Sequence, residues 1–328
     1  MARYLIRKLL VYLLTFFVAV TIDWLIPRFM PGDPIAGLVG RFQADPLASQ
    51  ELQRYFTKVY QLDQPMLTQY LNFWKGLVHG DLGPSVAYTG SHVGSLIWRA
   101  IPYTLGLLIP STVLSYIAGN RVGALAARRK VLDNSVLPVS YVLTATPYVW
   151  LALVIAYFFG ARWGWFPISG AYDFSQQPNW SWEFTWSYLY HWFLPFLSLF
   201  LVSFGGWAIG MRNLIIYELE ADYSNYLASL GAPTSLIRKY AYRNAVLPQM
   251  SGLALALGAV VGGALVTEIV FGYQGVGMLL FTALNNRDYF LLQGIFLFII
   301  LGVLIGNFLV DIAYVIVDPR TRTGIQGG

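Results

Sequence analysis

The sequence contains no cysteine and little charge. Without cysteine, the chain has no disulfide framework, no thiolate metal site and no cysteine nucleophile. Charged residues make up only 11% of its 328 positions, whereas soluble globular proteins contain roughly 25%. Hydrophobic residues make up 57%, more than a soluble fold can hide from water. The composition therefore indicates a protein that lies mainly in lipid.

The usual signatures of a catalytic site are also missing. A P-loop requires a lysine that follows glycine and precedes serine or threonine, and none of the five lysines stands in that setting. The three histidines, His79, His92 and His191, show no metal-ligand spacing, and no G-x-S-x-G segment marks a nucleophile elbow. The sequence therefore predicts a protein that is not an enzyme and has no metal site or cofactor of its own.

Six segments are long and apolar enough to cross a bilayer as helices, which takes about 20 residues. They are too long for the strands of a membrane barrel. The first has the basic start of a signal peptide but no small-residue cleavage site after it, so we expect a retained anchor helix. The predicted fold is an all-α membrane protein whose spans lie near residues 9–27, 103–127, 136–160, 188–211, 246–271 and 289–317.

The distribution of basic residues predicts the orientation of these spans. Of the 21 Lys and Arg residues, 13 lie in short segments on one side of the predicted membrane, and the others are spread over longer loops. By the positive-inside rule, both chain ends and the 212–245 segment are expected to be cytoplasmic. The basic charge is then mainly a topology signal and argues against nucleic-acid binding. The 13 residues are Arg3, Arg7, Lys8, Arg121, Arg128, Arg129, Lys130, Arg212, Arg238, Lys239, Arg243, Arg320 and Arg322.

Two longer loops are expected on the outer side. Residues 30–99 contain a helical run with Asp45 as N-cap and Pro46 at its first position, and a second run that ends at Gly80. The other loop is rich in tryptophan, which is typical of an aromatic belt at the headgroup level; such rings would also provide flat faces for sugars or for a docked partner. The six tryptophans within residues 161–192 are Trp163, Trp165, Trp180, Trp182, Trp186 and Trp192.

Ionisable residues inside spans often mark a transport pathway. Asp23, Glu268 and Asp311 lie toward span ends, and Asn307 precedes Asp311 by one helical turn. Glu268 is the best candidate for lining a path, together with its neighbour Thr267 and with Asn307. The alternative is that these groups make hydrogen bonds or ion pairs that hold helices together.

A polar segment at residues 221–248, "ADYSNYLASLGAPTSLIRKYAYRNAVLP", separates two membrane-length stretches. Within it, apolar and aromatic residues recur at i, i+3, i+4 and i+7, which predicts one face of a short helix over residues 222–230. Gly231 is placed to end that helix with a left-handed residue, and Pro233 prevents its continuation. The residues of the face are Tyr223, Tyr226, Leu227 and Leu230.

This apolar face has two interpretations. It would lie on lipid headgroups and on the protein's own helix ends, or it would dock on another protein. The acids near it, Glu218, Glu220 and Asp222, favour a protein, because anionic lipid would repel them.

The 221–248 segment resembles the EAA loop, the cytoplasmic signature of permease subunits in binding-protein-dependent ABC importers. The resemblance is to the dipeptide, oligopeptide and nickel subclass, and four further segments match it in the family's order. Counting back from Gly231, the name-giving Glu of the loop falls on Asn225, so the role of that Glu is not carried over. The four segments are "PGDP" at 31–34, "LDQPMLTQYLNFWKGLVHGDLG" at 62–83, "GYQGVGMLLFTALNNRDYFLLQG" at 272–294 and "DIAYVIVDPR" at 311–320.

The resemblance implies the type I importer permease fold, with six transmembrane helices. Its parts would be the first span (1–29), a helical extracytoplasmic insertion (30–99), a five-helix core with the coupling loop at 212–245 (100–319) and a cytoplasmic tail (320–328). The short helix would be the coupling helix, seated in a groove of an ATPase subunit. Its coupling residues would be Asp222, Tyr223, Tyr226, Leu227, Leu230, Gly231 and Ala232.

The resemblance also implies partners and a location. The partners would be a second homologous permease, two ATPase subunits that use ATP and Mg²⁺, and an extracytoplasmic solute-binding protein, all at the cell membrane of a prokaryote. Oligopeptides or dipeptides are the expected substrates. Oligosaccharides are the alternative, favoured by the clustered tryptophans, while sparse histidine and absent cysteine disfavour nickel. A more remote alternative is an ion-coupled secondary transporter, which predicts paired repeats with broken helices; the sequence shows none.

Overall fold

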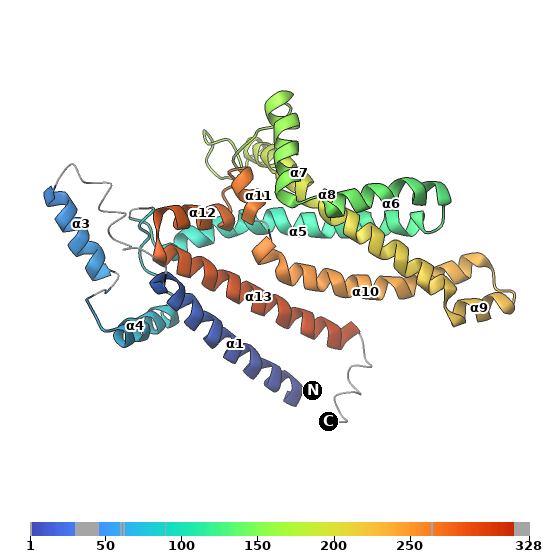
Figure 1. Cartoon of the computed structure of the whole chain (residues 1–328), viewed down its shortest axis with the longest axis horizontal. Coiled ribbons are helices and arrows are strands. Elements are labelled where there is room, and N and C mark those ends of the chain that lie inside the picture. Colours follow the sequence, from blue (N-terminus) through green and yellow to red (C-terminus); the bar gives the residue numbers. More distant parts are fainter. Residues whose placement is uncertain are drawn as a thin grey trace. The chain divides into compact units, whose positions relative to one another are not determined.

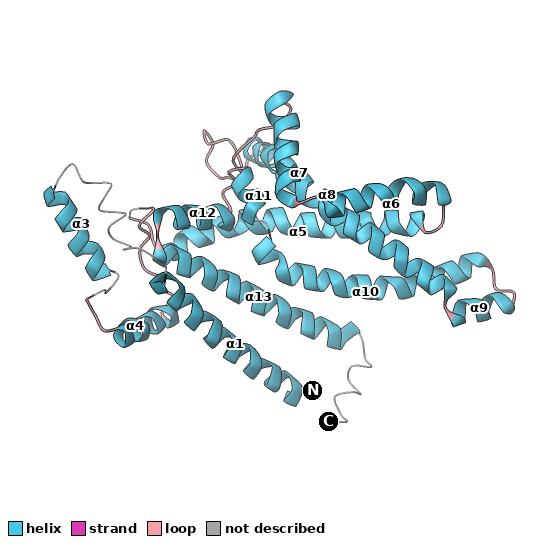
Figure 2. Ribbon diagram, viewed as in Figure 1, coloured by secondary structure: helices cyan, strands magenta, loops and turns pink. Residues whose placement is uncertain are grey.

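The computed structural model describes residues 2–29, 46–59, 61, 63–88, 90–263 and 265–317 (Figure 1). Among these residues the ordered elements are helices, and no β-strand is present (Figure 2). The all-α prediction is therefore confirmed. The "PGDP" segment, Asp45 and the expected tail at 320–328 lie outside the described residues.

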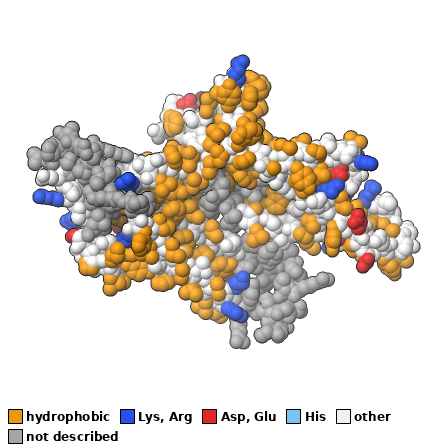
Figure 3. Space-filling view, in the orientation of Figure 1, with side chains coloured by type: hydrophobic (Ala, Val, Ile, Leu, Met, Phe, Trp, Pro, Cys, Tyr) orange, Lys and Arg blue, Asp and Glu red, His pale blue; other side chains and the backbone are white. Residues whose placement is uncertain are grey.

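Four of the expected spans coincide with long apolar helices. They are α1 (Ala2–Phe29), α5 (Val93–Ala126), α8 (Trp182–Glu220) and α13 (Tyr289–Val317). Each contains a stretch long and apolar enough to cross a membrane, as judged from length and composition over the described part of the chain. Hydrophobic side chains accordingly cover much of the visible face in Figure 3. The chain is a multi-pass membrane protein.

The expected third span, at 136–160, is a bent pair of helices instead of a straight one. Helix α6 (Lys130–Ala145) is followed by α7 (Tyr148–Ile155), which continues as the π-helix η2 (Ala156–Arg162). The axes before and after the break differ by 103°. Pro147 causes the break because proline pushes the preceding residue out of the helical region, and Thr146 has an extended backbone with ψ of 125°. If the pair counts as one span, the described helices provide five.

The expected fifth span, at 246–271, falls on two helices. These are α10 (Thr234–Gly263), which starts outside the predicted span, and α11 (Leu265–Val270). Residue 264 and the side chains of 258–263 are not among the described positions. A sixth span at this place therefore stays a prediction, as do the domain boundaries.

The chain divides into two compact units. Unit 1 comprises residues 1–102 and 274–304, and unit 2 comprises residues 103–273 and 305–328. Unit 1 holds α1, α3 (Pro46–Val59), α4 (Met66–Val78) and α12 (Val276–Asn286), with the first parts of α5 and α13. The two expected helical runs are present: α3 begins at Pro46, and the chain leaves α4 through Gly80 with φ of +72°. The bounds of the insertion at 30–99 stay a prediction.

Aromatic contacts attach α4 to α1 in unit 1. The ring of Trp74 stacks on Phe17 at 5.4 Å between centroids, and Tyr70 meets Trp24 edge-on at 5.1 Å. The Tyr70 hydroxyl also shares a 2.8 Å hydrogen bond with Thr21 Oγ1. Helix α4 is thus packed on the first span.

Close helix packing at glycine organises unit 2. Long α8 lies beside α6 and α10 (Figure 1). A Cβ on Gly205 of α8 would come within 2.5 Å of the Ser140 carbonyl oxygen of α6, and one on Gly123 of α5 would collide with the Ala208 carbonyl oxygen of α8. Small residues are the usual means by which membrane helices approach this closely. Helices α5, α6, α8 and α10 therefore form one packed scaffold.

Candidate functional site: the α9 surface and the polar positions of the core

Helix α9 (Asp222–Ser229) follows α8 after a single residue, in the place where the sequence predicts a short helix. Its end has the geometry of a Schellman motif. The amide of Gly231 donates to Ala228 O at 3.0 Å, and the amide of Ala232 donates to Leu227 O at 3.0 Å. Gly231 has φ of +74°, a conformation that glycine adopts readily and β-branched residues resist. The predicted helix end is confirmed.

The predicted apolar face of α9 is divided between two directions. Tyr226 and Leu230 are each 65% exposed. Tyr223 and Leu227 are half-buried, and Ser224, between them in sequence, is only 2% exposed. One side of α9 therefore packs on its own protein, while a Tyr-Leu pair faces outward. We call the exposed residues Tyr226, Leu230 and Gly231 the α9 surface. Acidic and basic side chains gather around this end of unit 2 (Figure 3).

Glu218, near the end of α8, ties α9 to two membrane helices. Its Oε2 accepts a 2.8 Å hydrogen bond from the Tyr223 hydroxyl of α9 and a 3.2 Å bond from Asn244 Nδ2 of α10. Its backbone carbonyl accepts a 2.7 Å bond from Ser224 Oγ. Burial raises the pKa of Tyr223, and the bond to Glu218 raises it further, so this hydroxyl stays a donor at neutral pH. We call Glu218, Tyr223, Ser224 and Asn244 the Glu218 joint.

The sequence did not predict the Glu218 joint. It indicated Glu218 only as one of the acidic residues near the short helix. Asn244 stands 26 residues after Glu218, and no local periodicity connects the two. Asn225, at the position of the EAA glutamate, is exposed and donates to Glu220 O at 3.2 Å. Asn225 thus makes a local contact with the end of α8.

The pathway candidates Thr267 and Glu268 lie together on α11, and both are buried, at 1% and 0% exposure. Thr104 Oγ1 of α5 donates a 2.7 Å hydrogen bond to Glu268 Oε1, and the amide of Tyr273 donates to Glu268 O at 2.8 Å. This arrangement supports the alternative that Glu268 holds helices together. Asn307 is half-buried on α13. Roles for these three residues in a pathway stay predictions.

The remaining acids inside spans have different surroundings. Asp23 on α1 is 2% exposed, and neither carboxylate oxygen has a hydrogen-bond partner among the described residues. The side chain of Asp311 is not described. Within the described residues, no group of three or more His, Asp and Glu side chains is arranged to hold a metal ion.

The tryptophans of the 161–192 region are mostly exposed. Trp163 and Trp165 lie 4.8 Å apart between ring centroids, and Trp180 is fully exposed. Trp192 differs, because its Nε1 donates to Gly106 O at 3.0 Å and its ring stacks on Phe196. Both interpretations of this region, an aromatic belt and a set of binding faces, stay open.

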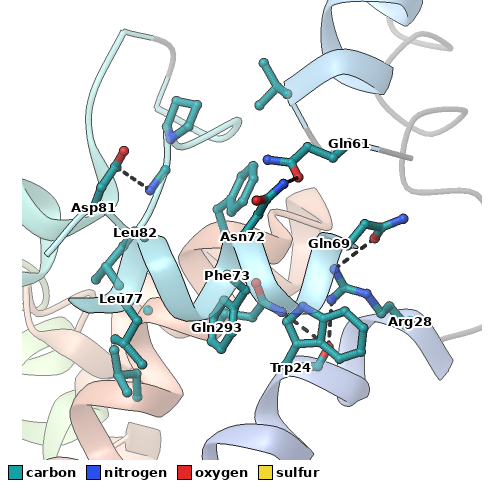
Figure 4. A pocket seen from close by; sticks show the side chains of 17 residues that line it. Trp24, Arg28, Gln61, Gln69, Asn72, Phe73, Leu77, Asp81, Leu82 and Gln293 are labelled. Atoms are coloured by element: carbon teal, nitrogen blue, oxygen red, sulfur yellow. Dashed lines mark hydrogen bonds between the residues drawn. The ribbon is translucent and has the colours of Figure 1, made fainter. Parts of the chain in front are cut away.

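A cavity of about 310 Å³ opens in unit 1 between α1, α4 and the start of α13 (Figure 4). The Arg28 guanidinium lies 3.6 Å from the Trp24 ring centroid and donates to Trp24 O at 2.7 Å. It also donates to Gln69 Oε1 at 3.1 Å, and Asn72 Nδ2 donates to Gln61 Oε1 at 2.7 Å. These bonds join α1 to α4, although Arg28 Nε and Trp24 Nε1 have no hydrogen-bond partner among the described residues. The cavity is thus a junction between the first span and α4.

The fold defines a class: a multi-pass membrane protein in which a short helix with an exposed tyrosine and leucine follows a long apolar helix. Comparison with known proteins is specific. The family model described as "Binding-protein-dependent transport system inner membrane component" matches residues 119–323, more than half of the chain. The chain belongs to this family and is the permease subunit of an ABC importer.

Three relatives illustrate the similarity over nearly the whole chain. The oligopeptide transport system permease protein AppB of Bacillus subtilis is 29% identical, with 98% of this chain and 99% of AppB covered. The di/tripeptide transport system permease protein DppB of Pseudomonas aeruginosa is 28% identical, with the same coverage. The probable D,D-dipeptide transport system permease protein DdpB of Escherichia coli is 30% identical, with 92% of each chain covered.

Family membership confirms several predictions. The chain is a non-catalytic membrane subunit, because separate ATPase subunits hydrolyse ATP in these importers, and permease subunits carry no cofactor of their own. It works with an ATPase and a binding protein. The alternative of an ion-coupled secondary transporter is wrong, because the chain is an ABC importer permease and separate ATPase subunits energise transport in such importers.

Proposed function

We propose that this chain forms half of the pathway by which an ABC importer carries dipeptides or oligopeptides into a prokaryotic cell. The other half would be a second, homologous permease, and the complex would contain two ATPase subunits. An extracytoplasmic binding protein delivers the peptide to the outer side, where residues 30–99 and 161–187 lie. Both chain ends and the 212–245 segment face the cytoplasm, in line with the positive-inside rule.

The α9 surface is the observation that carries this proposal. Tyr226 and Leu230 are each 65% exposed. On a helix at the cytoplasmic surface, this aromatic side chain would stay in water unless a partner covered it. Aromatic side chains of this kind often dominate the energy of protein interfaces. Acidic residues flank the helix, and anionic lipid would repel them. In an importer, the partner that would cover the α9 surface is an ATPase subunit, which would receive it in a groove.

The peptide substrate is proposed from the names of relatives that align over nearly the whole chain. AppB, DppB and DdpB are described as oligopeptide, di/tripeptide and D,D-dipeptide permeases. Their shared substrate class is the short peptide. Sparse histidine and absent cysteine in this chain give no ligand set for nickel.

Tyr226→Ala and Gly231→Val test the coupling role. Removing the Tyr226 anchor is expected to weaken ATPase association by about 2 kcal/mol, which is roughly 30-fold. Gly231→Val should misplace the same surface by penalising a left-handed residue. The matched control is Tyr157→Ala on η2, which removes a tyrosine of similar exposure, 56%, from another element.

The measurement is co-purification of the ATPase subunits and peptide-stimulated ATP hydrolysis in the reconstituted complex. Both α9 variants should insert normally, since neither position lies within a packed membrane helix. Wild-type association and transport in both variants would show that α9 is a passive surface element.

A further inference from the structure

A groove of about 340 Å³ lies in unit 2, between the end of α5 and one side of α10. Four of its lining residues follow the spacing i, i+3, i+4 and i+7, which places them on one helical face, and a tyrosine of α10 stands opposite. The helical turn continues past the end of α5, because the amide of Arg128 donates to Leu125 O at 3.1 Å. We call this feature the Arg121 groove, lined by Arg121, Ala124, Leu125, Arg128 and Tyr242.

The Arg121 groove has an apolar wall and a basic rim. Ala124 is buried at 6% exposure, and Leu125, beside it, is 45% exposed. The accessible wall is almost entirely apolar, so Arg121 and Arg128 line it with their aliphatic stems and direct their charged ends outward. Long basic side chains commonly cover apolar surface in this way. The residues that line the groove include no acid.

The two arginines are available to an anion. Both are exposed, and within the described part of the chain neither makes a hydrogen bond or an ion pair. Arg212, expected on the same side of the membrane, differs because it binds both carboxylate oxygens of Asp133, at 2.9 and 2.7 Å. Guanidinium groups bind phosphate strongly, often through two parallel hydrogen bonds. The rim of the groove therefore suits a phosphate group.

The sequence of α5 places Arg121 at the level of lipid headgroups. No charged residue occurs in the 21 residues between Arg99 and Arg121, and a helix of about this length crosses the hydrocarbon core. Arg121 thus stands where the core ends, and Arg128 stands two helical turns farther from it. Tyr242, which is 36% exposed, fits the same level, because tyrosine is enriched at membrane interfaces.

We propose that the Arg121 groove binds one anionic phospholipid of the cytoplasmic leaflet. Its phosphate would pair with Arg121 and Arg128, and the upper part of an acyl chain would lie against Leu125. Basic pockets beside membrane helices on the cytoplasmic side are suited to anionic headgroups. Inorganic phosphate shares the charge but gains nothing from the apolar wall, so the lipid is the occupant that uses both parts of the groove. The cytoplasmic placement rests on the proposed function.

The test uses the complete importer, purified in a neutral detergent, with phosphatidylglycerol as the probe. Phosphatidylcholine with the same acyl chains and inorganic phosphate are the comparison ligands. Native mass spectrometry measures how many lipid molecules each complex retains. The double variant Arg121→Gln/Arg128→Gln removes both charges from the rim. Its matched control, Arg129→Gln/Lys130→Gln, removes two exposed charges from the same connection between α5 and α6 without changing a lining residue.

The wild type should retain phosphatidylglycerol in preference to phosphatidylcholine. Arg121→Gln/Arg128→Gln should lower the affinity for phosphatidylglycerol about tenfold, because charge-assisted hydrogen bonds to the phosphate are lost, and the control should keep the wild-type affinity. Leu125→Glu, which places a carboxylate between the two arginines, should lose the lipid as well. Excess inorganic phosphate should leave the bound lipid in place.

Three results would overturn the proposal. Equal losses in both glutamine variants would show a general attraction between basic surface and anionic lipid. Displacement by inorganic phosphate would assign the arginines to a soluble anion. Loss of the ATPase subunits from the Arg121→Gln/Arg128→Gln complex would assign them to a protein surface. Peptide uptake in proteoliposomes tests the proposed function separately, whereas labelling of a cysteine at position 235 from outside the cell would overturn the cytoplasmic placement and both proposals.

Discussion

The Glu218 joint gives the sharpest prediction about how α9 is connected to the membrane helices. Glu218→Ala removes the acceptor for Tyr223 on α9 and for Asn244 on α10. Hydrogen bonds to a charged group contribute about 1.5–3 kcal/mol each. Because Glu218 is half-buried, we expect about 2 kcal/mol for the two together. The Ser224 bond to the backbone carbonyl is unaffected, so α9 should remain folded.

A loss of about 2 kcal/mol raises the population of detached α9 by roughly 30-fold. Hydrogen exchange at the amides of α9 should accelerate by this factor, while the melting temperature of the chain changes little. In the reconstituted importer, the number of peptides transported per ATP hydrolysed should fall. Glu220→Ala, which changes an exposed glutamate two residues away, is the matched control.

A double-mutant cycle separates the joint from a general effect of charge. Tyr223→Phe should lose part of the same protection, and the combination with Glu218→Ala should lose less than the sum of the two. The pKa of Tyr223 is raised by burial and by Glu218; the bond should therefore persist below the ordinary tyrosine pKa of about 10 and weaken as pH rises beyond it. Unchanged exchange and unchanged coupling in Glu218→Ala would refute the reasoning.

Two further predictions concern orientation and unit 1. Because the chain lacks cysteine, single cysteines in place of Ser235 and Lys58 can report on which side of the membrane each position lies. An impermeant thiol reagent outside intact cells should label position 58 and leave position 235 unlabelled. The reverse labelling pattern would contradict the predicted orientation. Asp288 is fully buried and accepts from Ser85 Oγ at 2.6 Å and from the amides of residues 86, 87 and 291. Asp288→Ala should destabilise the chain by about 3 kcal/mol, seen as a lower melting temperature. The control Asp63→Ala, at an exposed position, should leave the melting temperature unchanged. Equal melting curves for the two variants would show that the contacts of Asp288 contribute no net stability.

The membrane helices were predictable because hydropathy and length specify them locally. The expected span at 289–317 coincides with α13, and the helical run that ends at Gly80 coincides with α4. The bend between α6 and α7 was not predicted, because hydropathy measures how apolar a segment is and not the direction of its helix axis. The proline at 147 was the available signal, and its effect on Thr146 is what breaks the expected straight span.

The candidate site was predictable only in part. The i, i+3, i+4, i+7 spacing locates α9, and Gly231 locates its end, since both are local properties. The same spacing placed Tyr223 and Tyr226 on a single face, whereas the structure packs the first inward and exposes the second. That division depends on where α8 and α10 lie, which no local pattern contains.

Unit 2 contains a cavity of about 630 Å³ that is lined by residues of α5, α7, α8 and α10. The Glu218 joint shares α8 and α10 with this cavity. On α10, Asn244 of the joint and Gln249 of the cavity are five residues apart, a rise of about 7.5 Å. On α8, Glu218 follows the cavity residues Ser203 and Trp207 along one uninterrupted helix. A helix transmits displacement along its axis because its backbone hydrogen bonds make it stiff. On α10, Pro248 lies between Asn244 and Gln249 and cannot donate the backbone hydrogen bond to the Asn244 carbonyl. A displacement of α9 is therefore expected to reach the cavity walls chiefly along α8, and Glu218→Ala removes the side-chain link that connects the end of α8 to α10.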